Sequence, residues 1–346
     1  MSPYGAPQVP AVAALNTNEN PYSPSPALQK AITDAVAKVA VDLNRYPDRD
    51  ATILRTKLAT YINEGNGTSF TLDNIWAANG SNEIIQSIFL AFAQGAVLGF
   101  TPSYSMHPLI AKTTGAQWID GKRNADFSLN ASDAVSEIVK NKPSLTFITT
   151  PNNPTGGAVT LAEIQKLADA AKDVGGLLVV DEAYAEFSQE VSAVTLIANN
   201  PHVIVIRTMS KAFAFAGARL GYLVSDVAVK DAMMIVRLPY HLSALTQAAA
   251  QVAIDHRAEL LSGVSTLIKA RGEVVQALHD MGLTTITSSA NFVLFTGFKQ
   301  DAPQLWAALL EKGVLIRDVG LSGYLRVTIG NEAENKLFVS ALKELI

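Results

Sequence analysis

The chain of 346 residues contains no cysteine. This absence excludes disulfide bonds, thiol catalysis and thiolate metal sites, and it is compatible with a reducing compartment. The five histidines show none of the spacings typical of metal ligands, so we expect no metal centre. The amino terminus also lacks the basic start and apolar run of a signal peptide, and we expect a cytoplasmic protein.

Long apolar runs and an excess of one charge are missing as well. Even the stretch 84–100 is interrupted by Gln86, Gln94 and Gly95, so no segment reaches membrane-spanning length. The net charge is −4 and the basic residues form no cluster, which gives no reason to expect a nucleic acid or a membrane surface as partner. The composition, 49% hydrophobic and 17% charged, excludes disorder and predicts an extensive core.

From about residue 75 on, the sequence contains short apolar runs that alternate with helical patterns. Because these runs show no polar alternation, we expect buried strands in a sheet that helices cover on both faces. The predicted fold class is therefore α/β with a mostly parallel sheet. The expected strands are 75–78, 96–100, 145–149, 177–181, 203–207 and 220–224.

The last part of the chain changes character and predicts a second, smaller domain of mixed strands and helices. A long helical region precedes it at 244–281, and we expect this region to break or bend around Gly263 and Gly272. The predicted division has three parts: an N-terminal arm and helix that pack with the small domain (1–45), a large domain (46–260) and the small α+β domain (261–346).

One lysine stands in a stretch with almost no other polar residue. Lys211 follows the apolar run 203–206, so it lies just past the carboxyl end of an expected strand. Open α/β sheets bind their ligands at that edge. A lysine in such a place needs a partner or a chemical role. A partly desolvated amine is suited to forming a Schiff base with a carbonyl compound.

Two loops follow other expected strands. The segment 79–83 comes directly after the first strand and opens a helix. A helix N-terminus has free backbone N–H groups that can hold a phosphate, and the hydroxyl of Ser81 could add a ligand. Asn152 and Asn153 follow the third strand and could present an amide to a ligand oxygen. Taken alone, an ordinary helix cap and an ordinary loop explain these residues as well or better.

Asp181 ends the expected strand 177–181. A carboxylate so close to a buried strand needs a cation or strong hydrogen bonds, and a protonated pyridine nitrogen would supply the cation. Tyr184 lies three residues further on and could reach a neighbouring oxygen. An aspartate at a strand end is about as often a helix cap, so this pattern alone leaves both interpretations open.

Arginines complete the set. Arg219 follows Lys211 by eight residues and, with Ser210, could bind a phosphate. Arg317 and Arg326 could clamp a substrate anion, although periodicity alone cannot distinguish Arg326 from an outward-facing strand residue. Together the five patterns supply a phosphate site, a pyridinium partner, an amine for a Schiff base and an anion clamp. These are the groups that pyridoxal phosphate needs.

The ordered motifs resemble those of the fold-type I pyridoxal-phosphate aminotransferases. They are Asn153-Pro-Thr-Gly156, Asp181-Glu-Ala-Tyr184, Ser210-Lys211 and Arg219. More narrowly, the chain is similar, essentially end to end, to the histidinol-phosphate aminotransferase family. This narrower likeness lies in Leu15-Asn-Thr-Asn-Glu-Asn-Pro-Tyr22, Leu43-Asn-Arg-Tyr-Pro-Asp48 and Gly323-Tyr-Leu-Arg-Val-Thr-Ile-Gly330.

The resemblance implies a role for each matching residue. Lys211 would carry pyridoxal phosphate covalently, and Asp181 would face its pyridine nitrogen. The other cofactor residues implied are Asn153 and Tyr184 at the ring oxygen, Tyr104 against the ring face, Ser81, Asn82, Ser210 and Arg219 at the phosphate, and Tyr46 reaching the phosphate from the partner subunit of a homodimer. The substrate residues implied are Arg326 and Arg317 at the anionic group, with Asn20 and Tyr22 covering the pocket.

The reaction implied is a ping-pong transamination between L-histidinol phosphate and 2-oxoglutarate. In histidine biosynthesis it would run from L-glutamate to imidazole-acetol phosphate. Two rivals share nearly the same pocket, an aromatic-amino-acid aminotransferase and a decarboxylase of a phosphorylated amino acid. A cofactor-binding regulator would need an added DNA-binding segment, for which the chain has no basic stretch. A NAD-dependent dehydrogenase is excluded, because no Gly-x-Gly-x-x-Gly follows the first strand.

Overall fold

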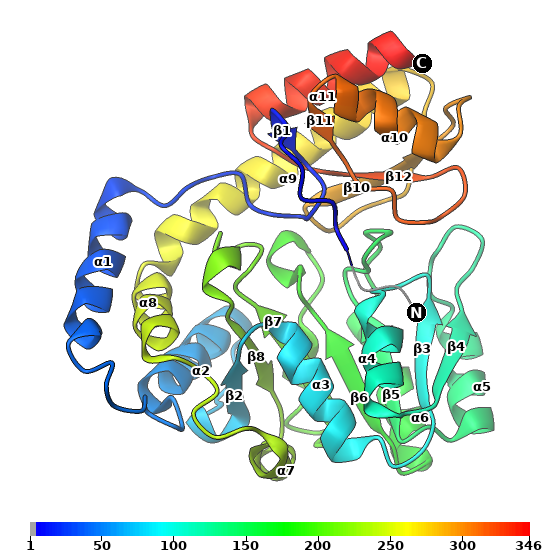
Figure 1. Ribbon diagram of the computed structural model, residues 1–346. Coiled ribbons are helices and arrows are strands. Elements are labelled where there is room, and N and C mark those ends of the chain that lie inside the picture. Colours follow the sequence, from blue (N-terminus) through cyan, green and yellow to red (C-terminus); the bar gives the residue numbers. More distant parts are fainter. Residues whose placement is uncertain (1–4) are drawn as a thin grey trace.

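The computed structural model describes residues 5–346, so the first four residues of the predicted arm lie outside the described part. A seven-stranded sheet forms the centre of the larger domain, in the order β2-β8-β7-β6-β5-β3-β4 (Figure 1). Strand β8 runs antiparallel to both of its neighbours, and the other pairs are parallel. The strands are β2 (Ile75–Ala78), β3 (Val97–Thr101), β4 (Trp118–Lys122), β5 (Leu145–Thr149), β6 (Leu177–Asp181), β7 (Val203–Thr208) and β8 (Gly221–Val224).

Helices cover this sheet on both faces, because its central strands are apolar on both sides. In β6, Leu178 and Val180 belong to one core cluster and Val179 belongs to the other, as the alternation of a strand requires. The mostly parallel α/β fold predicted from the sequence is confirmed. The covering helices are α3 (Ser81–Phe92), α4 (Met106–Thr114) and α7 (Val227–Val236) on one face, and α2 (Thr52–Asn66), α5 (Ala131–Asn141) and α6 (Leu161–Asp173) on the other.

The six expected strands of this sheet are confirmed to within one residue, but the edge strand β4 was not predicted. Its sequence, Trp-Ile-Asp-Gly-Lys, contains no apolar run, since Asp120 and Lys122 are exposed at the edge of the sheet. An edge strand pairs on one side only and needs no continuous apolar sequence. The absence of such a run is the physical reason that the prediction missed it.

The smaller domain contains an antiparallel sheet in the order β12-β10-β9 and a parallel pair, β1 with β11. Strand β1 belongs to the N-terminal arm, so the arm crosses the molecule to pair with the small domain (Figure 1). The elements are β1 (Ala13–Ala14), β9 (Thr284–Thr285), β10 (Phe292–Thr296), β11 (Val314–Leu315), β12 (Leu325–Thr328), α9 (Arg257–Asp280), α10 (Ala302–Glu311) and α11 (Glu332–Leu345). Short 3-10 turns lie at η1 (Leu72–Asn74), η2 (Ala185–Phe187), η3 (Ala193–Leu196) and η4 (Ala216–Ala218).

The N-terminal helix α1 (Pro26–Ala40) packs mainly against α8 (Ala244–Asp255), which lies in the range predicted for the large domain. The small side chains of α8, among them the buried Ala249 and Ala253, allow the two helices to approach closely. This corrects the prediction that the helix packs with the small domain. A domain boundary at residue 260 stays a prediction, because that position lies inside the continuous helix α9.

The long helical region breaks at His256, between α8 and α9, and not at the two glycines. Both Gly263 and Gly272 lie inside α9. A Cβ at Gly263 would lie 3.4 Å from the ring of Tyr22, so the arm packs closely over this residue. Gly263 therefore provides room for a neighbouring side chain, and α9 continues from the large domain to the small one (Figure 1).

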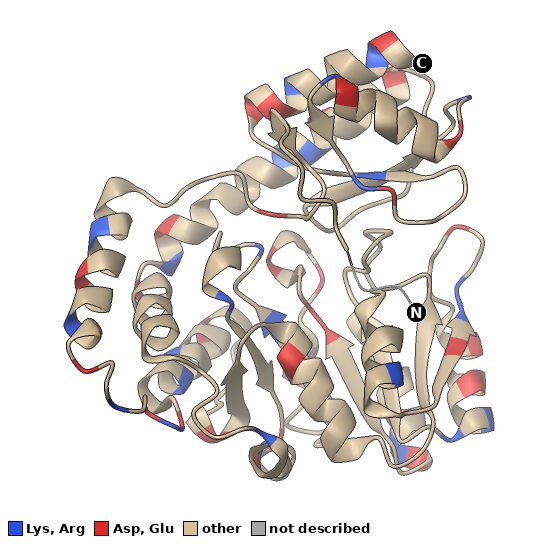
Figure 2. Cartoon of the chain, viewed as in Figure 1, with Lys and Arg blue, Asp and Glu red and all other residues tan. Residues whose placement is uncertain are grey.

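Charged residues of both signs are interspersed over the described part of the chain, mostly on the outer helices (Figure 2). No helix among residues 5–346 combines the length and the apolar character needed to cross a membrane. Within the same residues, no three His, Asp or Glu side chains come together in a group that could hold a metal ion.

Candidate active site

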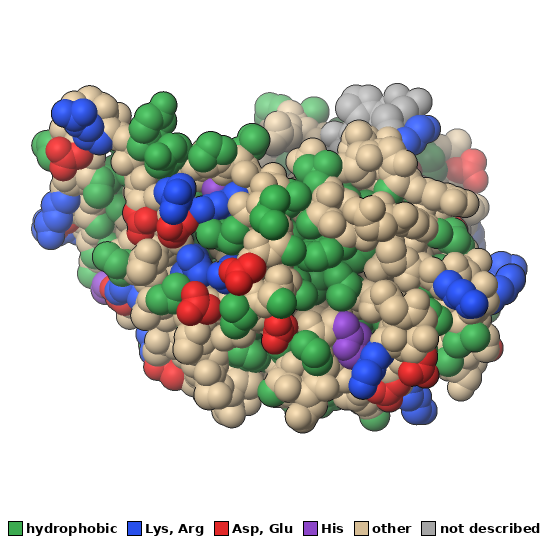
Figure 3. Space-filling model, turned by 90° about the horizontal axis from the view of Figure 1, so that it is seen from below, with side chains coloured by type: hydrophobic (Ala, Val, Ile, Leu, Met, Phe, Trp, Pro, Cys, Tyr) green, Lys and Arg blue, Asp and Glu red, His purple; other side chains and the backbone are tan. Residues whose placement is uncertain are grey.

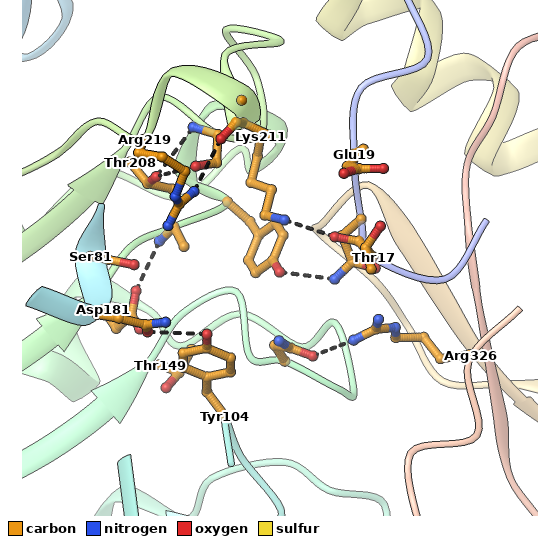
Figure 4. Close-up of a pocket in the computed structure, with 18 residues that line it drawn as sticks. Thr17, Glu19, Ser81, Tyr104, Thr149, Asp181, Thr208, Lys211, Arg219 and Arg326 are labelled. Atoms are coloured by element: carbon orange, nitrogen blue, oxygen red, sulfur yellow. Dashed lines mark hydrogen bonds between the residues drawn. The ribbon is translucent and has the colours of Figure 1, made fainter. Parts of the chain in front are cut away.

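A cavity of about 310 Å³ lies where the carboxyl ends of β5, β6 and β7 meet, with the N-terminal arm and β12 on its opposite side (Figure 4). Parallel α/β sheets place ligand sites at this edge. Its lining brings together most of the predicted residues: Thr17, Asn18, Glu19, Ser81, Asn82, Tyr104, Thr149, Asn153, Asp181, Ala183, Tyr184, Thr208, Ser210, Lys211, Ala216, Gly217, Arg219 and Arg326.

The side chain of Lys211 extends across this cavity, and its Nζ donates a hydrogen bond of 2.8 Å to the carbonyl oxygen of Thr17 on the arm (Figure 4). Burial of the amine lowers the pKa of Lys211 from 10.5 to about 8. The cations Arg326 and Arg219 also lower it, and Glu19 has the opposite effect. A substantial fraction of this amine is therefore neutral near physiological pH, as a nucleophile or proton acceptor must be.

The lowered pKa of Lys211 predicts how the apoprotein captures an aldehyde. Only the neutral amine can attack, so the capture rate should rise about tenfold per pH unit below pH 8 and level off above it. Stopped-flow absorbance of apoprotein mixed with pyridoxal phosphate measures this midpoint. Arg326→Gln should move the midpoint upward, because it removes a cation that disfavours the charged amine. A midpoint near 10 in the unmodified protein would contradict the assignment.

The turn between β2 and α3 forms a cup with an unusually close backbone approach. Gly80 has a positive φ of 84°, and a Cβ there would lie 2.7 Å from Nη2 of Arg219. A Cβ at Gly221, in the neighbouring strand, would lie 2.6 Å from the backbone N of Ser81. Arg219 is itself in the left-handed region, with φ 58°. The guanidinium group is thus held beside the N–H groups at the start of α3, an arrangement that suits a phosphate.

Two hydroxyl groups lie beside this cup at the end of β7. Thr208 Oγ1 donates to Ser210 Oγ at 3.0 Å and accepts from the backbone N of Ser210 at 3.2 Å. Both residues are buried and line the cavity. Ser210 was predicted as a phosphate ligand. Thr208 was not, because a threonine that closes a strand is ordinary on the basis of sequence.

Asp181 lies at the end of β6 and is 2% exposed. One oxygen, Oδ1, accepts from the backbone N of Ala183 at 3.2 Å, and Oδ2 lies 3.3 Å from Nε2 of His107. His107 comes from α4 and is equally buried, packed against the rings of Tyr104 and Phe147. A carboxylate fixed by two contacts at a cavity floor can face a cationic ring nitrogen.

The opposite wall of the cavity is a hydrogen-bonded chain that links β12 to the loop after β5. Arg326 is 6% exposed, and its Nη1 donates to Oδ1 of Asn153 at 2.6 Å. Its Nη2 donates to the carbonyl oxygen of Asn16 at 2.8 Å. The guanidinium carbon also lies 5.0 Å from the ring centroid of Phe292. Arg326 therefore faces the cavity (Figure 4), and the alternative of an outward-facing strand residue is wrong.

Two tyrosines complete the walls. The hydroxyl of Tyr184 accepts a hydrogen bond of 2.9 Å from Nδ2 of Asn18. The hydroxyl of Tyr104 donates to Oδ1 of Asn82 at 3.1 Å. Tyr104 is part-buried and lines the cavity near Asp181 (Figure 4), so its ring can lie against a planar ligand.

Four predicted residues do not line this cavity. Nδ2 of Asn20 donates to the carbonyl oxygen of Ala212, and Tyr22 lies in an outer groove between α9 and α11. Arg317 donates to the carbonyl oxygen of Gly5. Tyr46 is 80% exposed and stacks on Tyr240 with 4.4 Å between ring centroids. Substrate contacts by Asn20, Tyr22 and Arg317 stay predictions that this geometry does not support. A role of Tyr46 in the active site of a partner subunit also stays a prediction.

Several lining residues were missed by the sequence analysis as site residues. Three of these lining residues, Thr17, Asn18 and Glu19, lie in the segment Leu15-Asn-Thr-Asn-Glu-Asn-Pro-Tyr22. The resemblance of this segment to the family was a signal that could have marked them as site residues. His107, at the start of α4, does not line the cavity but contacts Asp181 and the ring of Tyr104, three residues before it in the sequence. Thr149 offered no signal, because it reads as the last residue of an apolar strand.

A model of the family described as aminotransferase class I and II matches residues 10–342. The chain belongs to the class I and II aminotransferases. This aminotransferase is 50% identical to the histidinol-phosphate aminotransferase of Mycobacterium sp. (strain JLS), over all of this chain and 92% of that protein. It is 51% identical to the histidinol-phosphate aminotransferase of Mycolicibacterium smegmatis, over 99% of this chain and 91% of the relative.

The aminotransferase also has the fold of known structures. The histidinol-phosphate aminotransferase of Sinorhizobium meliloti, solved in complex with pyridoxal-5'-phosphate, superposes with a TM-score of 0.84 at 24% identity. The match covers 97% of this chain and 91% of that one. At this identity the likeness establishes the shared fold.

Proposed function

We propose that this aminotransferase transfers an amino group between L-histidinol phosphate and 2-oxoglutarate. In the biosynthetic direction, L-glutamate and imidazole-acetol phosphate react, as a step of histidine biosynthesis. The observation that carries the proposal is about 50% identity, over the whole chain, to relatives of that activity. We propose the cytoplasm as its compartment, since these charged metabolites do not cross a membrane unaided.

The cavity fits the cofactor of the family, pyridoxal phosphate. The close approach of Gly80, Gly221 and Arg219 forms a cup that side chains would fill, and the cup is positively polarised by the start of α3. The residues that we assign to the cofactor are Ser81, Asn82, Ser210 and Arg219 at the phosphate, Asp181 at the pyridine nitrogen, Asn153 and Tyr184 at the ring oxygen, Tyr104 at the ring face and Lys211 at the aldehyde. When bound, the cofactor supplies an electron sink for the substrate carbon that carries the amine.

Lys211 is the proton carrier in this proposal. Its Nζ has a pKa lowered to about 8 by burial, so it can accept a proton from a substrate carbon and donate it again. The hydrogen bond to Thr17 holds the amine on the side of the cavity that faces the arm. Asp181, held in place by His107 and the backbone N of Ala183, would face the ring nitrogen.

Arg326 is assigned to the anionic group of the substrate. Its guanidinium faces the cavity and is oriented by Asn153 and Asn16. A planar guanidinium fork matches both a carboxylate and a phosphate ester, which lets one site accept glutamate and histidinol phosphate in turn. The test of the whole proposal is whether histidinol phosphate is the preferred amine donor over phenylalanine, the donor of the aromatic rival.

We also propose a homodimer with shared active sites. Ile235 and Leu238, at and just after the end of α7, are 84% and 76% exposed, and Tyr46 stacks on Tyr240 close by. The face seen from below, where α7 lies in Figure 1, carries hydrophobic side chains between charges of both signs (Figure 3). Exposed apolar groups gathered in this way are typical of an interface.

Sedimentation of the purified protein should give twice the mass of one chain. Leu238→Glu should shift it toward the monomer, because a charge would be buried at the interface. The same variant should bind pyridoxal phosphate more weakly, since Tyr46 would no longer reach the partner's cup. A monomeric variant with unchanged cofactor affinity would contradict the shared site.

A further inference from the structure

Glu19 stands at the mouth of the cavity on the arm, on the same stretch as Thr17 and across from Asp181 (Figure 4). Among the residues that line the cavity, Asp181 and Glu19 carry the negative charges. Asp181 is buried and fixed by His107 at the floor. Glu19 is exposed, so its carboxylate is the charged acceptor available to the part of a substrate that points outward.

The backbone on the amino-terminal side of Glu19 is held in an unusual conformation. Asn18 is 2% exposed and has a φ of 56°, in the left-handed region. Its backbone N donates to Oγ1 of Thr328 at 3.0 Å, and its Oδ1 accepts from the same hydroxyl at 3.0 Å. Its Nδ2 donates to the hydroxyl of Tyr184 at 2.9 Å, and its carbonyl oxygen accepts from Nδ2 of Asn291 at 3.2 Å. These contacts stabilise a conformation that would otherwise be unfavourable.

The backbone on the other side of Glu19 is fixed as well. Nδ2 of Asn20 donates to the carbonyl oxygen of Ala212, the residue after Lys211. Oδ1 of Asn20 accepts from the backbone N of Tyr22 at 3.0 Å. The backbone of Glu19 is therefore held between two anchored asparagines, one of which is tied to the residue after Lys211. A carboxylate on a fixed stretch of backbone can form a specific hydrogen bond to one substrate and so contribute to substrate selectivity.

The two amine donors of the proposed reaction differ in the groups that remain once the amine and one anion are bound. Histidinol phosphate still has an imidazole ring, which carries an N–H donor at neutral pH. Glutamate has a second carboxylate and no ring. We propose that the carboxylate of Glu19 accepts a hydrogen bond from the imidazole N–H and so makes this site selective for the imidazole substrate. This inference rests on the proposed function and names one of its specificity residues.

A second role for Glu19 must be separated from this one. Its charge also opposes the lowering of the Lys211 pKa. An effect that acts through Lys211 alters the reaction of every amine donor, because all of them use the same amine. An effect on imidazole binding alters histidinol phosphate alone. The two donors therefore distinguish the roles.

The experiment mixes the loaded enzyme with histidinol phosphate or with glutamate, in the absence of an acceptor, and follows the cofactor absorbance at several donor concentrations. Glu19→Ala should lower kcat/KM for histidinol phosphate about tenfold, the effect of one exposed charge-assisted hydrogen bond. Glu19→Gln, which keeps a neutral acceptor, should recover part of the loss. For glutamate, both variants should equal or exceed the unmodified enzyme. Glu273→Gln on α9, which is 68% exposed, is the matched control and should change neither donor.

Equal losses with both donors, or no loss with either, would overturn the role of Glu19 and leave the proposed function intact. A different result tests the proposed function itself. If the unmodified enzyme reacts with glutamate and not with histidinol phosphate, the proposed function is wrong and the inference falls with it.

Discussion

Lys211→Ala should lower kcat by about 10⁴-fold, because the variant loses both the covalent attachment of pyridoxal phosphate and the group that moves the proton. The cofactor should still bind, since the cup formed by Gly80, Ser81 and Arg219 is unchanged. It should however dissociate on dialysis. Steady-state rates, with cofactor added in excess, measure the first effect, and absorbance after dialysis measures the second.

Borohydride treatment followed by peptide mass analysis makes the assignment of Lys211 specific. In the unmodified enzyme the added mass should lie on the peptide that contains Lys211, and in Lys211→Ala it should be absent. Lys269→Ala is a suitable control, because Lys269 is 81% exposed on α9. Covalent cofactor in the Lys211→Ala protein would show that another amine carries it.

Asp181→Asn should bind pyridoxal phosphate and lower kcat about 10³-fold. The buried carboxylate is the anionic partner assigned to the ring nitrogen, and removing one member of a buried charge pair costs about 3–5 kcal/mol, which is about 10²–10³-fold or more in rate. The amide keeps the size of the side chain, and its oxygen can still accept from the backbone N of Ala183. The loss should therefore appear in kcat with the structure of the cavity retained.

Asp301→Asn is the matched control, because Asp301 is exposed before α10 and makes no side-chain cap there. Circular dichroism should be the same for both variants. A kcat of Asp181→Asn near that of the unmodified enzyme would remove Asp181 from the proposed role, whatever the cofactor affinity.

Apolar runs made most of the fold predictable. The strands β5 and β6 consist mostly of apolar residues and are buried on both faces, which the sequence pattern predicts for a sheet covered on both sides. The edge strand β4 lacks such a run. The packing of α1 on α8 depends on tertiary contacts. A helical pattern predicts that one side of a helix is apolar, but it does not predict which other element that side packs against.

The core of the site could be predicted from side chains with unusual chemistry. The main-chain groups of the site could not be predicted. Lys211, Asp181 and Arg219 stand at strand ends in apolar surroundings, where a charge requires an explanation. The carbonyl oxygen of Thr17, which accepts from Lys211, is a group that every residue has, so no residue type marks it. His107 is separated from Asp181 by 74 residues, and only the order of the strands brings the two together.

The most direct test of the proposed function compares amine donors with the purified, cofactor-loaded enzyme and 2-oxoglutarate as acceptor. The measured quantity is kcat/KM for histidinol phosphate and for phenylalanine under the same conditions. We predict a preference for histidinol phosphate of about tenfold or more, because phenylalanine offers a carboxylate to Arg326 but no ring N–H to the mouth of the cavity. A preference for phenylalanine would contradict the assigned substrate and leave the aminotransferase family unaffected.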